Sequence, residues 1–69
     1  MEHPPNDEYV VTCQLGHTPD PLLGTVVFAS PDVTMAWRYY NSLSPLAGTS
    51  IVLWDPEAGL MATQIGERN

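Results

Sequence analysis

The sequence predicts a small α+β domain in which a four-stranded sheet carries one helix on one face, with the elements in the order ββαββ. The prolines and glycines lie between the short apolar runs or at their ends, where such residues mark turns and element boundaries. One central stretch repeats apolar residues at helical spacing, whereas the apolar runs around it are short and rich in β-branched side chains. At 69 residues the chain has the length of one domain.

We expect this domain to span residues 9–65. Residues 1–8 contain two prolines and three carboxylates, which is typical of a mobile N-terminal arm, and residues 66–69 follow the last apolar run as a short tail. So small a domain buries a limited core, and such domains usually gain support from disulfides, a metal or a partner chain.

The first two strands are predicted at residues 9–14 and 24–29 because both stretches are rich in β-branched and aromatic residues. Residues 15–23 lie between them and contain Gly16, Pro19 and Pro21, which block regular structure. This loop is long for a connection between paired strands, and long ordered loops often carry binding function.

The helix is predicted over residues 31–43. Ser30 has a hydroxyl suited to an N-cap, and Pro31 suits the first helical position because its missing N–H costs nothing there. Pro45 ends the helix, since the residue before a proline avoids helical geometry. One apolar stripe follows the helix, made by Val33, Ala36, Trp37, Tyr40 and Leu43.

The last two strands are predicted at residues 51–54 and 60–65, joined by a four-residue hairpin loop that places Asp55 opposite Leu60. Alternation along these strands then leaves apolar side chains on both faces of the sheet. A single helix covers one face only. The second face is covered either by self-association or by the 15–23 loop together with the N-terminal arm.

We interpret self-association as the favoured cover, because the chain is too short to add a second layer. The interface is predicted to involve side chains of the last two strands and an apolar pair on the helix beside an arginine. These residues are Val52, Leu53, Trp54 and Met61, with Met35, Arg38 and Tyr39 as a second patch.

Composition excludes several function classes. The formal net charge is −6, lysine is absent, and Arg38 and Arg68 are the only arginines, so the chain lacks the cations that bind nucleic-acid phosphates or acidic lipids. Cys13 is the only cysteine and the N-terminus lacks a signal-like apolar stretch, which favours a reduced, cytoplasmic setting. The apolar runs are far shorter than the roughly 20 residues that a membrane span needs.

Catalytic and metal-binding motifs are weak. Cys13, His17 and Asp20 invite a nucleophile–base interpretation, but Cys13 belongs to a predicted strand and is typical of a small core residue. His17 is typical of a solvated loop histidine. Since the Cys and His residues lack zinc-type spacing, we expect neither a metal nor another cofactor.

The sequence therefore favours a small non-enzymatic interaction protein that acts as a homo-oligomer and binds another protein. The alternative is a small-ligand binder with a pocket formed by the 15–23 loop, in which His17 and Asp20 contact the ligand. The absence of lysine, together with seven prolines and five glycines, is typical of a GC-rich genome such as that of an actinobacterium or one of its phages.

Overall fold

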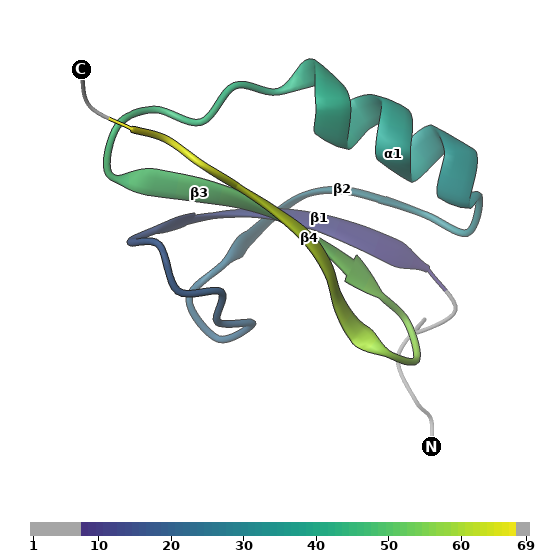
Figure 1. Cartoon of the computed structure of the whole chain (residues 1–69). Coiled ribbons are helices and arrows are strands. Elements are labelled where there is room, and N and C mark those ends of the chain that lie inside the picture. Colours follow the sequence, from purple (N-terminus) through teal and green to yellow (C-terminus); the bar gives the residue numbers. More distant parts are fainter. Residues whose placement is uncertain (1–7, 68–69) are drawn as a thin grey trace.

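The computed structural model of the chain describes residues 8–67 and confirms the predicted ββαββ fold (Figure 1). Most of the predicted arm and tail, residues 1–7 and 68–69, lies outside the described residues. The strands β1, β3 and β4 extend slightly beyond their predicted bounds, β2 is shifted by one residue, and the helix is shorter than predicted. The elements are β1 (Tyr9–Leu15), β2 (Thr25–Ser30), α1 (Val33–Ser42), β3 (Thr49–Asp55) and β4 (Gly59–Ile65).

The four strands form one antiparallel sheet in the order β2-β1-β3-β4. Strand β1 lies between β2 and β3, so these two strands run parallel without touching, and the connection through α1 passes over β1. Figure 1 shows α1 on one side of the sheet. Strands β2 and β4 form the two edges, and each has one side without a strand partner.

The core lies between α1 and the central strands. Val11, Ile51 and Leu53 from the sheet pack against Ala36 and Tyr40 from the helix. Of the predicted apolar stripe, Ala36 and Tyr40 are buried and Trp37 and Leu43 pack against the core, whereas Val33 is exposed. Burial also raises the pKa of the Tyr40 hydroxyl.

The helix begins at Val33 and its N-cap is Asp32, so the prediction of Ser30 as N-cap is wrong. The Asp32 carboxylate accepts a hydrogen bond from the backbone N–H of Thr34 at 2.9 Å. The Ser30 hydroxyl accepts instead from the backbone N–H of Asp32 at 3.1 Å and stabilises the approach to the helix. A carboxylate at the cap satisfies an orphan N–H and also faces the positive end of the helix dipole.

The predicted β3–β4 register is confirmed at its inner pairs, where Val52 lies opposite Thr63. It is wrong nearer the turn, because a β-bulge between Leu53 and Trp54 shifts the pairing by one residue. Trp54 therefore lies opposite Leu60. Met61 is the extra residue of the bulge, and it packs against the core.

The bulge follows from the shape of the hairpin turn. Asp55 pairs with Gly59, which has a φ of 93°, a left-handed conformation that glycine adopts without strain. The Asp55 carboxylate accepts hydrogen bonds from the backbone N–H groups of Glu57 at 2.7 Å and Ala58 at 2.9 Å. These bonds to the ionised form lower the pKa of Asp55.

The sheet face opposite α1 is covered by the loop over residues 16–24 (Figure 1). Gln14 holds this loop, since its amide donates to the Thr18 carbonyl at 2.7 Å and its side-chain oxygen accepts from the backbone N–H of Asp20 at 2.9 Å. Gly24 passes so close to the Thr12 side chain that an added Cβ would lie 2.8 Å from it.

Two further side-chain hydrogen bonds fix this far face. The Trp54 indole N–H donates to the Thr12 hydroxyl at 2.9 Å, and the Ser50 hydroxyl donates to the Gly16 carbonyl at 2.7 Å. Val52 points toward this face and has no exposed surface. The sequence offered this loop as the alternative cover of the second face. The loop lies over part of that face.

The folded domain includes Gly66, which the sequence analysis placed in the C-terminal tail. Gly66 is buried, and its N–H donates to the Thr49 carbonyl at 2.9 Å while its carbonyl accepts from Gly48 at 3.2 Å. A Cβ at this position would collide with the carbonyl oxygen of Leu46, so only glycine fits. Within residues 8–67, no helix has the length and apolar character to cross a membrane.

Candidate functional site

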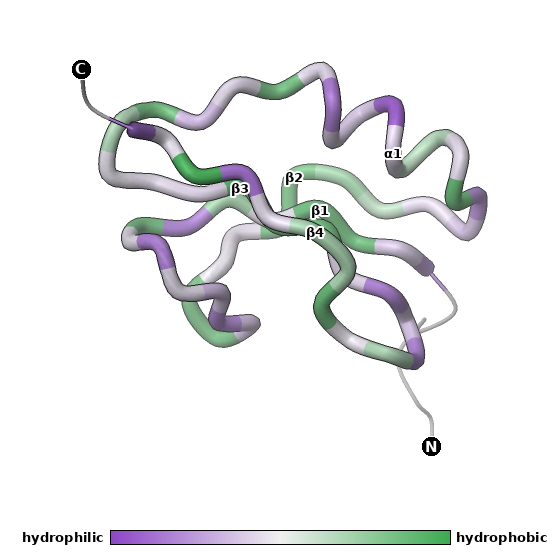
Figure 2. Tube along the Cα trace, in the orientation of Figure 1, coloured by the Kyte–Doolittle hydropathy of each residue, from purple (hydrophilic) through white to green (hydrophobic). Residues whose placement is uncertain are grey.

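Exposed apolar side chains gather along the β2 edge of the molecule. They come from the end of the covering loop, from β2 itself and from the first turns of α1. Figure 2 shows apolar residues along these segments. Exposed apolar residues are enriched at interaction sites, so this edge is the first candidate for one. The residues are Leu22, Leu23, Val26, Val27, Val33 and Met35.

A hollow of about 330 Å³ lies where β2 faces the helix. Phe28 from β2 lines it, and its ring stacks on the Tyr39 ring with the centroids 4.5 Å apart and the planes 12° apart. Met35, Arg38 and Ser42 line the rest of it from α1. We call the combined area the α1–β2 surface, which comprises Val27, Phe28, Met35, Arg38 and Tyr39.

Three of these residues, Met35, Arg38 and Tyr39, belong to the second patch predicted from the sequence, and the structure brings them together in one hollow. Phe28 and Ser42 were not predicted. Ser42 lies one helical turn beyond Arg38, a signal that the sequence contains. The position of Phe28 depends on which side of α1 faces β2, and the chain order carries no signal for that.

The α1–β2 surface is almost free of charge. Between Asp20 and Asp55 the only charged residues in the sequence are Asp32 and Arg38, although the whole chain has a net charge of −6. Asp32 follows β2, and Glu8 precedes Tyr9, the partner of Ser30, so carboxylates lie near one end of β2, while Arg38 lines the hollow. Such a neutral area is where another acidic molecule meets the least repulsion.

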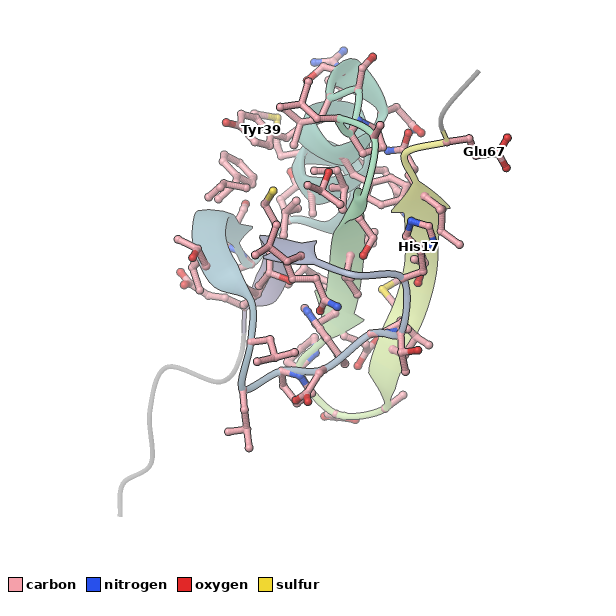
Figure 3. The ribbon with its side chains drawn as sticks, turned by 90° about the vertical axis from the view of Figure 1, so that its left-hand side faces the viewer. His17, Tyr39 and Glu67 are labelled. Carbon is pink, nitrogen blue, oxygen red and sulfur yellow. The ribbon has the colours of Figure 1, made fainter. Side chains whose placement is uncertain are left out.

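A second hollow of about 620 Å³ lies at the other end of the sheet. His17 of the covering loop and Glu67, which follows β4, line this hollow (Figure 3). The other lining residues are Ala47, Gly48 and Gly66. Figure 3 shows His17 and Glu67 on the side of the molecule away from Tyr39. This hollow offers one imidazole and one carboxylate.

The structure does not bring Asp20 into this hollow with His17, as the ligand-binding alternative expected. The Asp20 carboxylate accepts from the backbone N–H of Leu22 at 2.9 Å, and its own N–H donates to Gln14. The loop therefore uses Asp20 to hold its own turn, because an aspartate before such a turn satisfies the backbone locally.

Cys13 lies on β1 and packs against the core beneath α1, whereas His17 is exposed beyond the end of that strand. No hydrogen bond joins the two side chains in the part of the chain from Glu8 to Glu67. The same residues contain no group of three or more His, Cys, Asp or Glu side chains that could hold a metal ion.

The predicted interface on the last two strands lacks the exposure that it requires. Val52 and Leu53 are each 0% exposed, and Leu53 belongs to the core beneath α1. Trp54 and Met61 are half-buried, and both are engaged within the chain, Trp54 with Thr12 and Met61 with the core. The prediction of Val52 and Leu53 as surface contacts is therefore corrected, and the exposed candidate area moves to the α1–β2 surface.

Comparison with known proteins finds no match for this chain among family models, curated proteins or solved structures.

Proposed function

We propose that this chain is a small non-enzymatic interaction module that associates with itself and binds another protein through the α1–β2 surface. The observation that carries the proposal is an apolar, almost uncharged surface beside an open strand edge on an otherwise acidic chain. Large exposed apolar patches on soluble domains mark interaction sites.

The residue types on this surface support the proposal. Aromatic residues, methionine and arginine are enriched at protein interfaces, and the surface presents Tyr39, Met35 and Arg38 from one side of one helix. The stacked rings of Phe28 and Tyr39 form a flat apolar area that a partner side chain can cover without rearranging the backbone.

The limited core points in the same direction. The buried apolar residues come from the centre of the sheet and from one side of α1, while Phe28, Trp37 and Tyr39 stay half-buried. A partner that covers the α1–β2 surface removes more apolar area from water, at about 25 cal/mol per Å². Association thus adds stability that a domain of this size lacks.

Sedimentation equilibrium tests the proposal with a matched pair of variants. Met35→Glu places a charge on the α1–β2 surface, and Leu60→Glu places the same charge on the opposite edge, where the wild-type side chain has similar exposure, 52% against 44%. We expect the wild type and Leu60→Glu to sediment above the 7.6 kDa monomer mass and Met35→Glu to return to it.

Partner binding is measured with the same variants in pull-downs from the native host. The proposal expects a protein that the wild type and Leu60→Glu retain and Met35→Glu loses. A wild-type mass near 7.6 kDa across the micromolar range, with no protein whose retention depends on Met35, would contradict it.

A second candidate function is small-ligand binding in the hollow beside His17, because its volume of about 620 Å³ is within the range of ligand sites. Its lining offers few polar groups. Titration with small carboxylates and amines, followed by the NMR signals of His17 and Glu67, tests this candidate. A His17→Ala variant that loses a saturable shift would favour it over the interaction module.

A further inference from the structure

Strand β2 is an edge of the sheet, and a β-bulge at Val27 interrupts its pairing with β1. It spans Thr25–Ser30 and contains no charged residue and no proline, and its side without a partner exposes backbone donors and acceptors. Natural sheets usually protect such edges with lysine, proline, inward charges, β-bulges or a covering segment, because an open edge pairs readily with another strand. Of these devices β2 has the bulge at Val27, and it lacks charges and proline. An uncharged edge beside an apolar hollow is a place where a strand can be added.

The other edge, β4, also lacks charges, but its surroundings differ. Asp55 and Glu57 lie at its hairpin end, and Glu67 follows its far end. Antiparallel pairing of β4 with the β4 of a second copy would bring the hairpin end of each copy to the Glu67 end of the other. Like charges that face each other oppose this arrangement.

The ends of β2 are compatible with each other. Leu22 and Leu23 precede it, and Asp32 follows it. Antiparallel pairing of β2 with a second β2 places the Asp32 end of each copy beside the apolar end of the other, so it brings no carboxylate pair together. Charge therefore selects β2 over β4 as the edge at which two copies meet.

We infer that β2 pairs antiparallel with the β2 of a second copy about a two-fold axis, which joins the two sheets into one continuous sheet. This inference rests on the proposed function and names its self-association partner and geometry. A two-fold axis that relates antiparallel neighbours stands perpendicular to the sheet, so both α1 helices lie on the same face. The hollows beside Phe28 and Tyr39 then adjoin each other across the axis.

A second copy fits this edge for two reasons. Two chains of net charge −6 repel each other over most of their surfaces, but the segments that meet here carry only Asp32 and Arg38, one charge of each sign per copy. A stable interface needs about 800 Å² per partner, which is a moderate share of the 4551 Å² that the chain exposes.

Disulfide trapping tests the strand pairing. In a Cys13→Ser background, Val27→Cys places one thiol at the middle of β2, where an antiparallel two-fold pair brings the two copies of a residue close together. Leu60→Cys places a thiol on the β4 edge as the control. Under mild oxidation we expect Val27→Cys to form a covalent dimer at least about ten-fold faster than Leu60→Cys, because association holds the paired thiols together.

A second measurement uses the wild-type chain, so its result does not depend on whether the cysteine variants fold. In a mixture of isotope-labelled and unlabelled chains, filtered nuclear Overhauser effects between β2 residues of different copies are expected. A sedimenting dimer that shows neither these signals nor the Val27→Cys cross-link overturns the strand pairing and leaves the proposed function standing. Preferential cross-linking of Leu60→Cys overturns the choice of β2, and a monomer in every measurement overturns self-association itself.

Discussion

Asp55 shows how one carboxylate sets the geometry of a turn. Its side chain accepts the backbone N–H groups of Glu57 and Ala58, and the chain then closes through the left-handed conformation of Gly59. These two hydrogen bonds favour the ionised carboxylate and lower its pKa in the folded protein. The turn shape and the β-bulge beside Trp54 follow from this local arrangement.

The lowered pKa predicts a pH dependence of the hairpin. Because the folded pKa of Asp55 lies below its unfolded value, the stabilisation is fully present above the unfolded pKa and is lost as the pH falls through the folded pKa. We expect Asp55→Ala to reduce this acid-linked part of the stability. Urea unfolding at neutral pH and in acid, for wild type and variant, measures it. Asp20→Ala is the control, and an unchanged acid dependence in Asp55→Ala would contradict the assignment.

At the scale of elements, the loop over residues 16–24 acts as a second layer for the sheet. Gln14, which is 4% exposed, connects the loop to β1 through its amide, and Gly24 allows close approach to Thr12. On the other face α1 supplies the cover. The two central strands therefore have cover on both faces, and the β2 and β4 edges are left open.

Removal of the Gln14 amide is expected to release this loop. Gln14→Ala leaves the Thr18 carbonyl and the Asp20 N–H without their partner, which costs about 1–3 kcal/mol of unfolding free energy. Thr18→Ala is the matched control, because Thr18 uses only its backbone oxygen. We expect Gln14→Ala alone to lower the urea midpoint and to speed thermolysin cleavage at Leu22 and Leu23. Equal cleavage rates in both variants would show that the loop is held by other contacts.

At the scale of the whole molecule, stability depends on a few central side chains. Leu53 has no exposed surface and lies under α1, whereas Leu60 on the β4 edge is 52% exposed. A domain of this size has on the order of 5 kcal/mol of net stability, so the loss of one buried leucine is a large fraction of it.

Leu53→Ala is therefore expected to cost about 2–5 kcal/mol and to leave the chain largely unfolded at 37 °C. Leu60→Ala should cost much less, because its side chain is half in water already. Thermal melts followed by circular dichroism compare the two. Similar melting temperatures for both variants would place the main stabilising contacts outside the α1–sheet core.

Much of the fold is encoded locally. The β-branched runs, the helical stripe that includes Ala36 and Tyr40, and the proline at position 45 predict the elements in their correct order, because each signal acts over a few residues. The N-cap was predicted at Ser30 but is Asp32, and the reason is also local. Both side chains make the same local type of hydrogen bond, and sequence spacing does not rank them.

The amino-acid sequence by itself determined the element order, the apolar stripe of α1 and the membership of Met35, Arg38 and Tyr39 in one helix-borne patch. Only the tertiary structure decided that the 16–24 loop is held on the sheet by Gln14, that Phe28 completes the hollow, and that β2 is an open edge. Those three outcomes depend on which strands become neighbours and which side of the sheet each segment covers. Such contacts join residues far apart in the chain, so local periodicity and spacing carry no signal for them.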